Sequence, residues 1–452
     1  MIAGGAGTLL ALGLLGFAGA LAARADLAWI FSLALGLSIF AGNWSELAVT
    51  QLSIGLDRVV LFIAFVAFVV RRTSTARGSR LEPAHWLLLL AAVYAVVSAI
   101  WVGTLTEREG MFHLLDTFGL VPFAMFVAAP HVFASERQLR ILLWMLTSVG
   151  AYLSVTALFE TVRLNAFIFP QYIVDPDVGI HFGRARGPFA EAVANGLAIF
   201  ACGVAAIILA SMSRRLAVRM TCIAVVGAAS SALVMTLTRA IWLGSVVAIL
   251  VALLAVRRLR PYAFVAIPFL VAVVFVTVSV VPELGTRAAE RQAAQAPIWD
   301  RINTTNAAFR MLDERPLLGF GWDRFTEESE PYLRQKDDIP LTGRDTDLHN
   351  VFLARAVELG VLGGALWLAA FVMAVVLPAF ASASRALEPW RIGLLAITIQ
   401  WIVAASLGPL PYVFANLLLW TWAGLVYPHR RACLAEARRP LADRRWEVGY
   451  ST

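Results

Sequence analysis

Residues 188–210, PFAEAVANGLAIFACGVAAIILA, decide the class of fold, because Glu191 is the only ionisable side chain in this run. A run of this length exceeds the ~20 apolar residues that a helix needs to cross a bilayer. The composition agrees, since 60% of the 452 residues are hydrophobic, 15% are charged and the mean hydropathy is +0.76. Soluble domains are about one-quarter charged. The chain is therefore an integral membrane protein. The same composition excludes a soluble multidomain enzyme, a disordered chain and a disulfide scaffold.

The apolar segments also distinguish between the two architectures that span membranes. They are continuous and rich in Leu and Ala, whereas a transmembrane barrel requires alternating segments of ~10 residues. We therefore predict an all-α polytopic membrane protein with about 12–13 transmembrane helices. The predicted spans are 2–23, 27–41, 52–70, 84–103, 110–129, 138–160, 188–210, 216–236, 239–256, 261–281, 349–377, 390–406 and 410–427. The first span is predicted to be a retained helix. Without it, twelve spans would leave both termini inside.

Arginines set the predicted orientation. They gather in breaks between spans at 71–80, 214–219 and 257–260, here called the basic breaks, and in the tail at 428–452. Basic residues mark the cytoplasmic side of membrane proteins. The long segment 282–348 contains 13 acidic against 9 basic residues, and we predict that it is an extracytoplasmic, partly helical loop. It separates a bundle of about ten spans, 1–281, from the C-terminal spans, 349–427.

Cofactor and metal motifs are not evident in the sequence. The 3 cysteines form no CxxC pair and the 6 histidines are scattered, so we predict no metal site and no cofactor. The pair Asp345 and Asp347 has a DxD shape and leaves a bound divalent cation as a minority alternative. No phosphate-binding loop occurs, and the net charge of +7 is explained by topology, so no nucleic-acid partner is expected.

Polar side chains at the predicted outer side are candidates for substrate binding, because such groups are costly in a membrane. Arg239 lies in MTLTRAIWL, between two apolar runs with almost no loop, so it must face the bundle or a cavity. Guanidinium groups bind phosphate oxygens in pairs and stay charged. For any single arginine the alternative is a helix end, where the side chain reaches headgroups or loop carboxylates. The other candidates are Arg184, Arg186, Glu191, Asn195, Arg301 and Arg310.

His349 is the candidate general base. It begins the span after the long loop, where the helix dipole favours a neutral ring that can accept a proton from a hydroxyl. Asp345 and Asp347 oppose this effect, and an interfacial hydrogen-bonding role is the alternative. Glu358 lies nine residues on and points away from His349 on a straight helix. Asp116 is either a proton-relay residue or a buried carboxylate bonded to a neighbouring helix.

Four ordered motifs between about 180 and 365 resemble those of the O-antigen ligase and O-antigen polymerase superfamily of bacterial membrane glycosyltransferases. His349-Asn350, nine residues and then Gly360-Val-Leu-Gly363 is similar to its His-(Asn/Ser/Gln)-x9-Gly-x-x-Gly signature. Arg239-Ala-Ile-Trp-Leu243 resembles its Arg-x3-Leu element. The turn Arg315-Pro-Leu-Leu-Gly-Phe-Gly-Trp322 and the segment Arg186-Gly-Pro-Phe with Asn195 complete the set.

The resemblance implies a GT-C-like membrane enzyme that transfers a glycan from undecaprenyl diphosphate to an acceptor. The reaction would take place at the periplasmic face of the bacterial inner membrane, without a metal or a nucleotide sugar. By the same resemblance, Arg239 would hold the diphosphate and His349 would position or deprotonate the acceptor hydroxyl. Arg301 and Arg310 would be additional phosphate ligands. The remaining predicted substrate-binding residues are Arg184, Arg186, Glu191, Asn195 and Asn350.

The acceptor distinguishes the two leading hypotheses. A ligase joins the lipid-linked glycan to a glycan or lipid-glycan acceptor, as in lipopolysaccharide biosynthesis, whereas a polymerase extends an O-antigen or exopolysaccharide from the same donor. A lipid-linked glycan flippase or a transporter is a third alternative, but it requires a polar path through the bilayer. The centres of the spans at 216–281 contain few ionisable residues, which favours transfer over transport.

Overall fold

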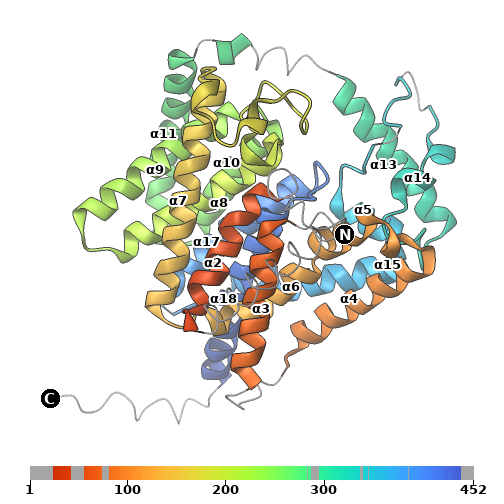
Figure 1. The fold of residues 1–452 in the computed structure, drawn as a ribbon, viewed down its shortest axis with the longest axis horizontal. Coiled ribbons are helices and arrows are strands. Elements are labelled where there is room, and N and C mark those ends of the chain that lie inside the picture. Colours follow the sequence, from red (N-terminus) through yellow and green to blue (C-terminus); the bar gives the residue numbers. More distant parts are fainter. Residues whose placement is uncertain are drawn as a thin grey trace, which may run out of the picture.

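The computed structural model describes residues 24–41, 55–73, 81–281, 283–286, 295–335, 339–344, 346–384 and 386–438. Three predictions fall outside the described residues: the retained first helix at 2–23, the contribution of Asp345, and the end of the basic tail. Figure 1 shows a bundle of helices, with α13, α14 and α15 on one side of it.

The regular elements of the described part are helices. The longer ones are α2 (Leu27–Leu37), α3 (Leu56–Thr73), α4 (Pro83–Val102), α6 (Leu120–Val132), α7 (Glu136–Thr161), α8 (Ala192–Met212), α9 (Leu216–Met235), α10 (Arg239–Ala255), α11 (Arg260–Val280), α13 (Ala296–Glu314), α15 (Val351–Phe371), α17 (Glu388–Ala405) and α18 (Val413–Arg438). The shorter ones are η1 (Ser38–Phe40), η2 (Thr104–Thr106), α5 (Arg108–Phe112), η3 (His113–Phe118), η4 (Asn165–Phe167), η5 (Gln171–Val174), η6 (Gly187–Phe189), α14 (Phe325–Glu328), η7 (Glu330–Tyr332), η8 (Val372–Val376) and α16 (Leu377–Phe380).

Every predicted span within the described residues coincides with helix. By length and composition, 7 helices of the described part could cross a membrane, and 3 shorter apolar helices accompany them at Leu27–Phe40, Arg239–Ala255 and Val413–Tyr427. The predicted all-α polytopic membrane fold is confirmed. One predicted span, 110–129, is interrupted, since the π-helical turn η3 and Gly119, with a φ of 122°, separate α5 from α6.

Helix α8 lies at the centre of the bundle and packs against α7, α9 and α17. In the apolar 18-residue stretch of α8, 83% of the residues are buried inside the structure, whereas in that of α11 only 11% are buried. Helix α11 therefore presents its apolar side chains outward. Small residues let the helices approach closely. A Cβ on Gly196 would lie 2.6 Å from Ile241 of α10, so this glycine is required for the contact between α8 and α10.

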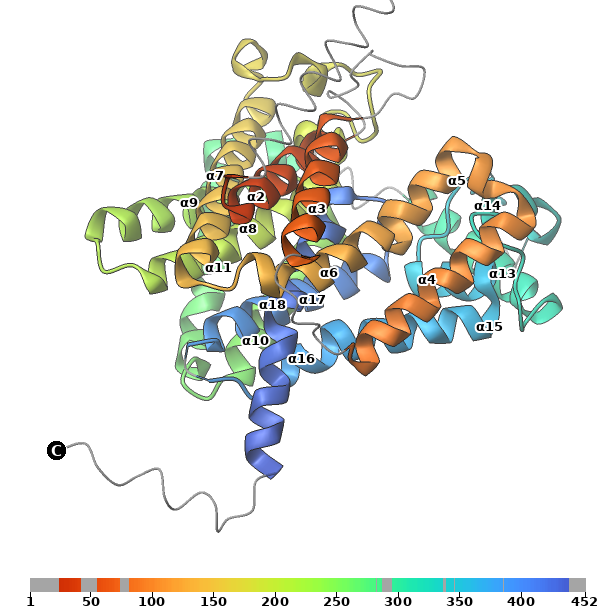
Figure 2. The ribbon, with the colours of Figure 1, turned by 60° about the horizontal axis from the view of Figure 1, so that its bottom comes forward.

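The helices α4, α13, α14 and α15 form a second group, on one side of the molecule (Figure 2). Helix α15 is broken at Gly360, where φ is 68° and ψ is 176°. The turn 315–322 packs into this break, with Phe320 N–H donating to Val357 C=O (3.0 Å) and Gly321 N–H to Glu358 C=O (2.8 Å). Val361 N–H donates back to Pro316 C=O at 2.8 Å. The long loop is thereby joined to the span that follows His349.

Candidate functional site

Arg239 is the first residue of α10 and its side chain is exposed. The connection from α9 is three residues long, and Leu237 in it has a φ of 48°. Thr238 Oγ1 donates to Thr236 C=O at 2.8 Å and holds this tight turn. The chain therefore places the guanidinium at a helix start, which explains how a charge is accommodated between two apolar runs.

Arg301 lies on α13, in the long loop, and close enough to Arg239 for the two charges to interact. Its pKa is lowered, first by burial and then by the positive charge of Arg239, while Asp300 opposes the shift. Arg301 Nε is buried and has no hydrogen-bond partner in the part of the chain that the structure describes. Two guanidinium groups from distant parts of the sequence therefore share one region, which would favour an anion.

His349 lies directly before Asn350, the residue that caps α15 by accepting Leu353 N–H on its side-chain oxygen at 3.0 Å. The pKa of His349 is lowered, mainly by burial and then by the charge of Arg301, against the opposing carboxylates of Asp300 and Asp347. Its Nδ1 atom is buried without a hydrogen-bond partner among the described residues. The ring is therefore neutral near pH 7, the state that accepts a proton.

Residues 223–368 match the family model of the O-antigen ligase. The predicted resemblance to the O-antigen ligase superfamily is confirmed. The match begins within α9 and ends within α15, so the matched region contains Arg239, Arg301 and His349. A comparison with curated proteins found no match.

Arg186 is buried within the loop between α7 and α8. It is 1% exposed, and its guanidinium donates to the carbonyls of Ile173 (2.9 Å), Val178 (2.5 Å) and Asp175. These contacts use the donors that would bind a phosphate, and they hold the loop between α7 and α8 together. These contacts favour a bracing role for Arg186, and its predicted substrate-binding role stays a prediction.

Glu191 and Asn195 brace the same loop. Glu191 caps α8 by accepting Ala194 N–H at 2.7 Å, and its second oxygen lies 2.8 Å from His181 Nδ1. Asn195 is fully buried and donates to Ala185 C=O at 3.0 Å. These contacts occupy both carboxylate oxygens of Glu191, whereas Asn195 Oδ1 is buried without a hydrogen-bond partner among the described residues. Sequence reasoning placed them correctly near the start of α8, but it could not show that neighbouring backbone groups occupy them.

The remaining predicted residues differ in position. Arg184 is half-buried, and the next residue, Ala185, donates its N–H to Met235 C=O (3.1 Å) at the end of α9. Arg310 donates to Tyr332 C=O at 2.7 Å. It follows Arg301 by nine residues, two and a half helical turns, and so lies on the opposite face of α13. The geometry favours Arg301 over Arg310 as the arginine of the site.

Ion pairs that the sequence did not reveal line a small cavity of about 60 Å³ beside the start of α15. His113 Nδ1 lies 2.8 Å from Asp323, and Arg355 pairs with Glu358 at 2.6 Å, with both side chains less than one-tenth exposed. Glu358 is thus held by its own helix and does not orient His349. Asp116 pairs with Arg58 of α3. This pair agrees with the alternative that Asp116 is a buried carboxylate bonded to a neighbouring helix. Among the described residues, no group of three or more His, Cys, Asp or Glu side chains could hold a metal.

The motif residues around the break in α15 serve packing. A Cβ on Gly360 would lie 2.0 Å from Leu317 C=O, and one on Gly363 would lie 2.4 Å from the ring of Tyr94. Trp322 is fully buried, donates its indole N–H to Gly110 C=O (2.9 Å) and stacks under Arg355. The Gly-x-x-Gly and Gly-Trp motifs thus fix the loop to the bundle, and this attachment positions His349 beside Arg301.

Proposed function

We propose that the chain is a glycosyltransferase that moves a glycan from a polyprenyl-diphosphate donor to an acceptor hydroxyl at the outer membrane face. The observation that carries the proposal is the grouping of Arg239, Arg301 and a neutral His349. They come from three separate segments of residues 223–368, which match the O-antigen ligase family model. Two arginines supply charge for a diphosphate, and the histidine supplies a base. This combination suits the transfer of a group from a phosphate leaving group.

The chemistry requires little covalent participation from the protein. The acceptor oxygen attacks the anomeric carbon as the bond from that carbon to the diphosphate oxygen breaks, so the configuration inverts. The hydroxyl proton passes to His349, and Arg239 and Arg301 stabilise the charge that develops on the diphosphate. Preorganised charge of this kind is usually the largest contribution to catalysis. No metal or cofactor is needed for these steps.

The mutual repulsion of Arg239 and Arg301 supports an anionic substrate. The pKa of Arg301 is lowered first by burial and then by the positive charge of Arg239, so the two guanidinium groups repel one another. An anion that binds between them relieves this repulsion. Each arginine could also bind two phosphate oxygens at once. We therefore assign the diphosphate to Arg239 and Arg301 and the acceptor hydroxyl to His349.

Reconstitution with a synthetic polyprenyl-diphosphate-linked glycan tests the proposal. We expect transfer by the wild type, and a loss of about 10²- to 10⁴-fold in His349→Ala, the range for removal of a general base. Donor binding by this variant should persist. Unchanged turnover in His349→Ala would contradict the assigned role of the histidine.

The identity of the product decides between ligase and polymerase. A glycan joined once to a lipid-glycan acceptor indicates a ligase, and a growing lipid-linked chain indicates a polymerase. We favour the ligase, because the matching family model describes that activity. Movement of intact donor across the bilayer without transfer would instead indicate a flippase.

A further inference from the structure

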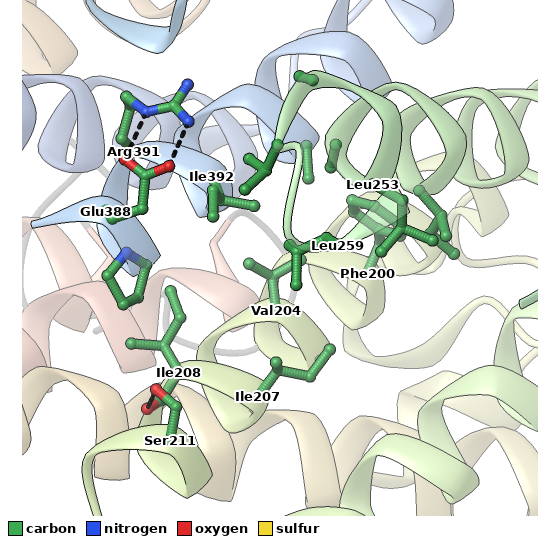
Figure 3. A pocket seen from close by; sticks show the side chains of 18 of the residues that line it. Phe200, Val204, Ile207, Ile208, Ser211, Leu253, Leu259, Glu388, Arg391 and Ile392 are labelled. Carbon is green, nitrogen blue, oxygen red and sulfur yellow. Dashed lines mark hydrogen bonds and ion pairs between the residues drawn. The ribbon is translucent and has the colours of Figure 1, made fainter. Parts of the chain in front are cut away.

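A cavity of about 940 Å³ lies between α8, α9, α10 and α17, apart from the candidate site (Figure 3). Residues 256–259 of the link between α10 and α11, at the opposite end of α10 from Arg239, line part of it. The walls are apolar over most of their area, and the side chains shown in Figure 3 include Phe200, Val204, Ile207, Leu253 and Ile392. None of the residues assigned to donor or acceptor lines this space.

The depth of the cavity fits one hydrocarbon chain. Along α8 it extends from Phe200 to Ser211, a distance of about 16 Å at the helical rise. Half of a bilayer's hydrocarbon core is about 15 Å thick. An apolar space of this length is suited to the acyl chain of a lipid from the leaflet nearest the link between α10 and α11.

Two arginines that line the cavity have no ionic partner among the described residues. Arg257 and Arg258 line it, both are exposed, and neither has a hydrogen bond or ion pair among the described residues. Arg391, which also lines the cavity, differs because it pairs with Glu388 at 2.8 Å and donates to Ala379 C=O at 2.9 Å. Two exposed guanidinium groups beside an apolar cavity suit a lipid, because they can bind its headgroup phosphate while the cavity holds its hydrocarbon tail.

We propose that this cavity binds one anionic glycerophospholipid, with an acyl chain along α8 and the headgroup phosphate between Arg257 and Arg258. The basic breaks assign this end of the bundle to the cytoplasmic leaflet, where anionic lipids attract basic residues. The donor's diphosphate is assigned to the opposite end of α10, so a phospholipid is the better occupant. Binding joins α8 to α10, and it stabilises the folded bundle by mass action.

The test begins with delipidated wild-type protein in a neutral detergent, titrated with dioleoyl phosphatidylglycerol or dioleoyl phosphatidylcholine. Thermal melting and native mass spectrometry follow each titration. We expect phosphatidylglycerol to bind in a 1:1 complex and raise Tm, and phosphatidylcholine to do so far more weakly. Arg257→Gln/Arg258→Gln should weaken phosphatidylglycerol binding about 10- to 30-fold, the contribution of two arginines near a membrane surface.

A matched control is available in the neighbouring basic break. Arg214 and Arg215 are also adjacent and exposed, but they do not line the cavity. Arg214→Gln/Arg215→Gln removes the same charge and should leave the affinity within about twofold of the wild type. An equal loss in both double variants would show general surface attraction and would overturn the proposal.

A second variant tests the cavity itself. Gly203 lines it, and a Cβ there would meet only Ala229, at 3.7 Å, so Gly203→Leu has room to extend into the cavity. We expect this variant to melt at or above the wild-type temperature without lipid and to lose most of the increase in Tm with phosphatidylglycerol. A full increase in the Tm of Gly203→Leu with phosphatidylglycerol would contradict the proposal. Equal binding of both phospholipids by the wild type would contradict it as well, and so would a polyprenyl phosphate retained as the bound lipid.

Discussion

The pKa of His349 is lowered mainly by burial and then by the charge of Arg301, a residue from another element. A lowered pKa keeps the ring unprotonated to lower pH, so transfer is retained until the pH falls through that pKa. Arg301→Gln removes the positive charge, and the pKa of His349 should rise. The acid limb of the kcat/KM profile should therefore move to higher pH. A pH–rate series with the reconstituted enzyme measures this movement.

Arg310 provides the control for that series. It lies on the same helix but on the opposite face, bonded to the carbonyl of Tyr332. Arg310→Gln should leave the acid limb unchanged, even if it loosens the loop. If the limb stayed in place in Arg301→Gln, the electrostatic coupling between Arg301 and His349 would be absent.

Arg239 and Arg186 are both arginines that precede apolar spans, but the structure predicts opposite phenotypes for their substitution by lysine. Arg239→Lys keeps the charge and loses the paired donors, so donor affinity should fall about tenfold or more while Tm stays near that of the wild type. Arg186→Lys loses several buried hydrogen bonds and should cost about 2 kcal/mol or more of stability. Donor-binding titrations and thermal melts separate the two. Full donor affinity in Arg239→Lys would contradict the diphosphate assignment.

At this scale the sequence predicted some positions better than others. Arg239 and His349 were identifiable because an ionisable side chain between two apolar runs, or at the start of one, is costly in a membrane unless it binds a polar group. The structural roles of Arg186, Glu191 and Asn195 were not identifiable. Their partners are mostly backbone carbonyl and N–H groups of the folded chain, with the His181 side chain beside Glu191, and a sequence does not show which groups a side chain reaches.

At the scale of elements, the break in α15 is the feature on which the position of His349 depends. Gly360 has a φ of 68°, and a Cβ there would lie 2.0 Å from Leu317 C=O. Gly360→Ala therefore combines backbone strain with a clash, and we expect a loss of about 3 kcal/mol or more. Gly227→Ala in α9 is the control, since its Cβ would have no neighbour within 4 Å and alanine favours helix. A thermal melt of Gly360→Ala that matched this control would show that the break tolerates a side chain.

The pair of Arg355 and Glu358 gives a second test of α15. Both side chains are buried, and the bond between them is 2.6 Å long. Arg355→Met leaves a buried carboxylate without its partner, which typically costs about 3–5 kcal/mol. Arg355→Met/Glu358→Leu removes both charges and should recover most of that loss. A double variant no more stable than the single one would show that the stacking of Arg355 on Trp322, not the ion pair, is what matters.

The helices themselves were largely predictable, because a continuous apolar run that is long enough to cross a bilayer permits few other structures. The interruptions were not. The π-turn at His113–Phe118 and the break at Gly360 arise where a second segment packs against the helix, as the turn 315–322 does at Gly360. These interruptions determine where α13 and His349 lie. The sequence therefore predicted the spans more fully than it predicted the candidate site.

At the scale of the whole molecule, the links at the two ends of the helices differ in their charge. The link between α8 and α9 and the link between α10 and α11 contain basic breaks, whereas the opposite ends of α8 and α10 adjoin Arg184, Arg239 and the acidic loop. Because successive helices cross the bundle in turn, the basic breaks should share one side and Arg301 and His349 the other. The positive-inside rule predicts that the first side is cytoplasmic, so the second should face the outer surface, where we propose that the donor lies.

Single cysteines in the full-length chain test this assignment, on a background in which Cys433 is replaced by serine. Gln335 in the long loop and Arg215 in a basic break are both exposed, so each thiol would be accessible to a maleimide. A membrane-impermeant maleimide should label Gln335→Cys in intact cells once the outer membrane is permeable, and Arg215→Cys only after the inner membrane is opened. The native Cys202 and Cys222 are buried and should remain unlabelled. The reverse pattern would place His349 and both arginines on the cytoplasmic side, away from a periplasmic donor and acceptor, and the proposed transfer reaction could not take place.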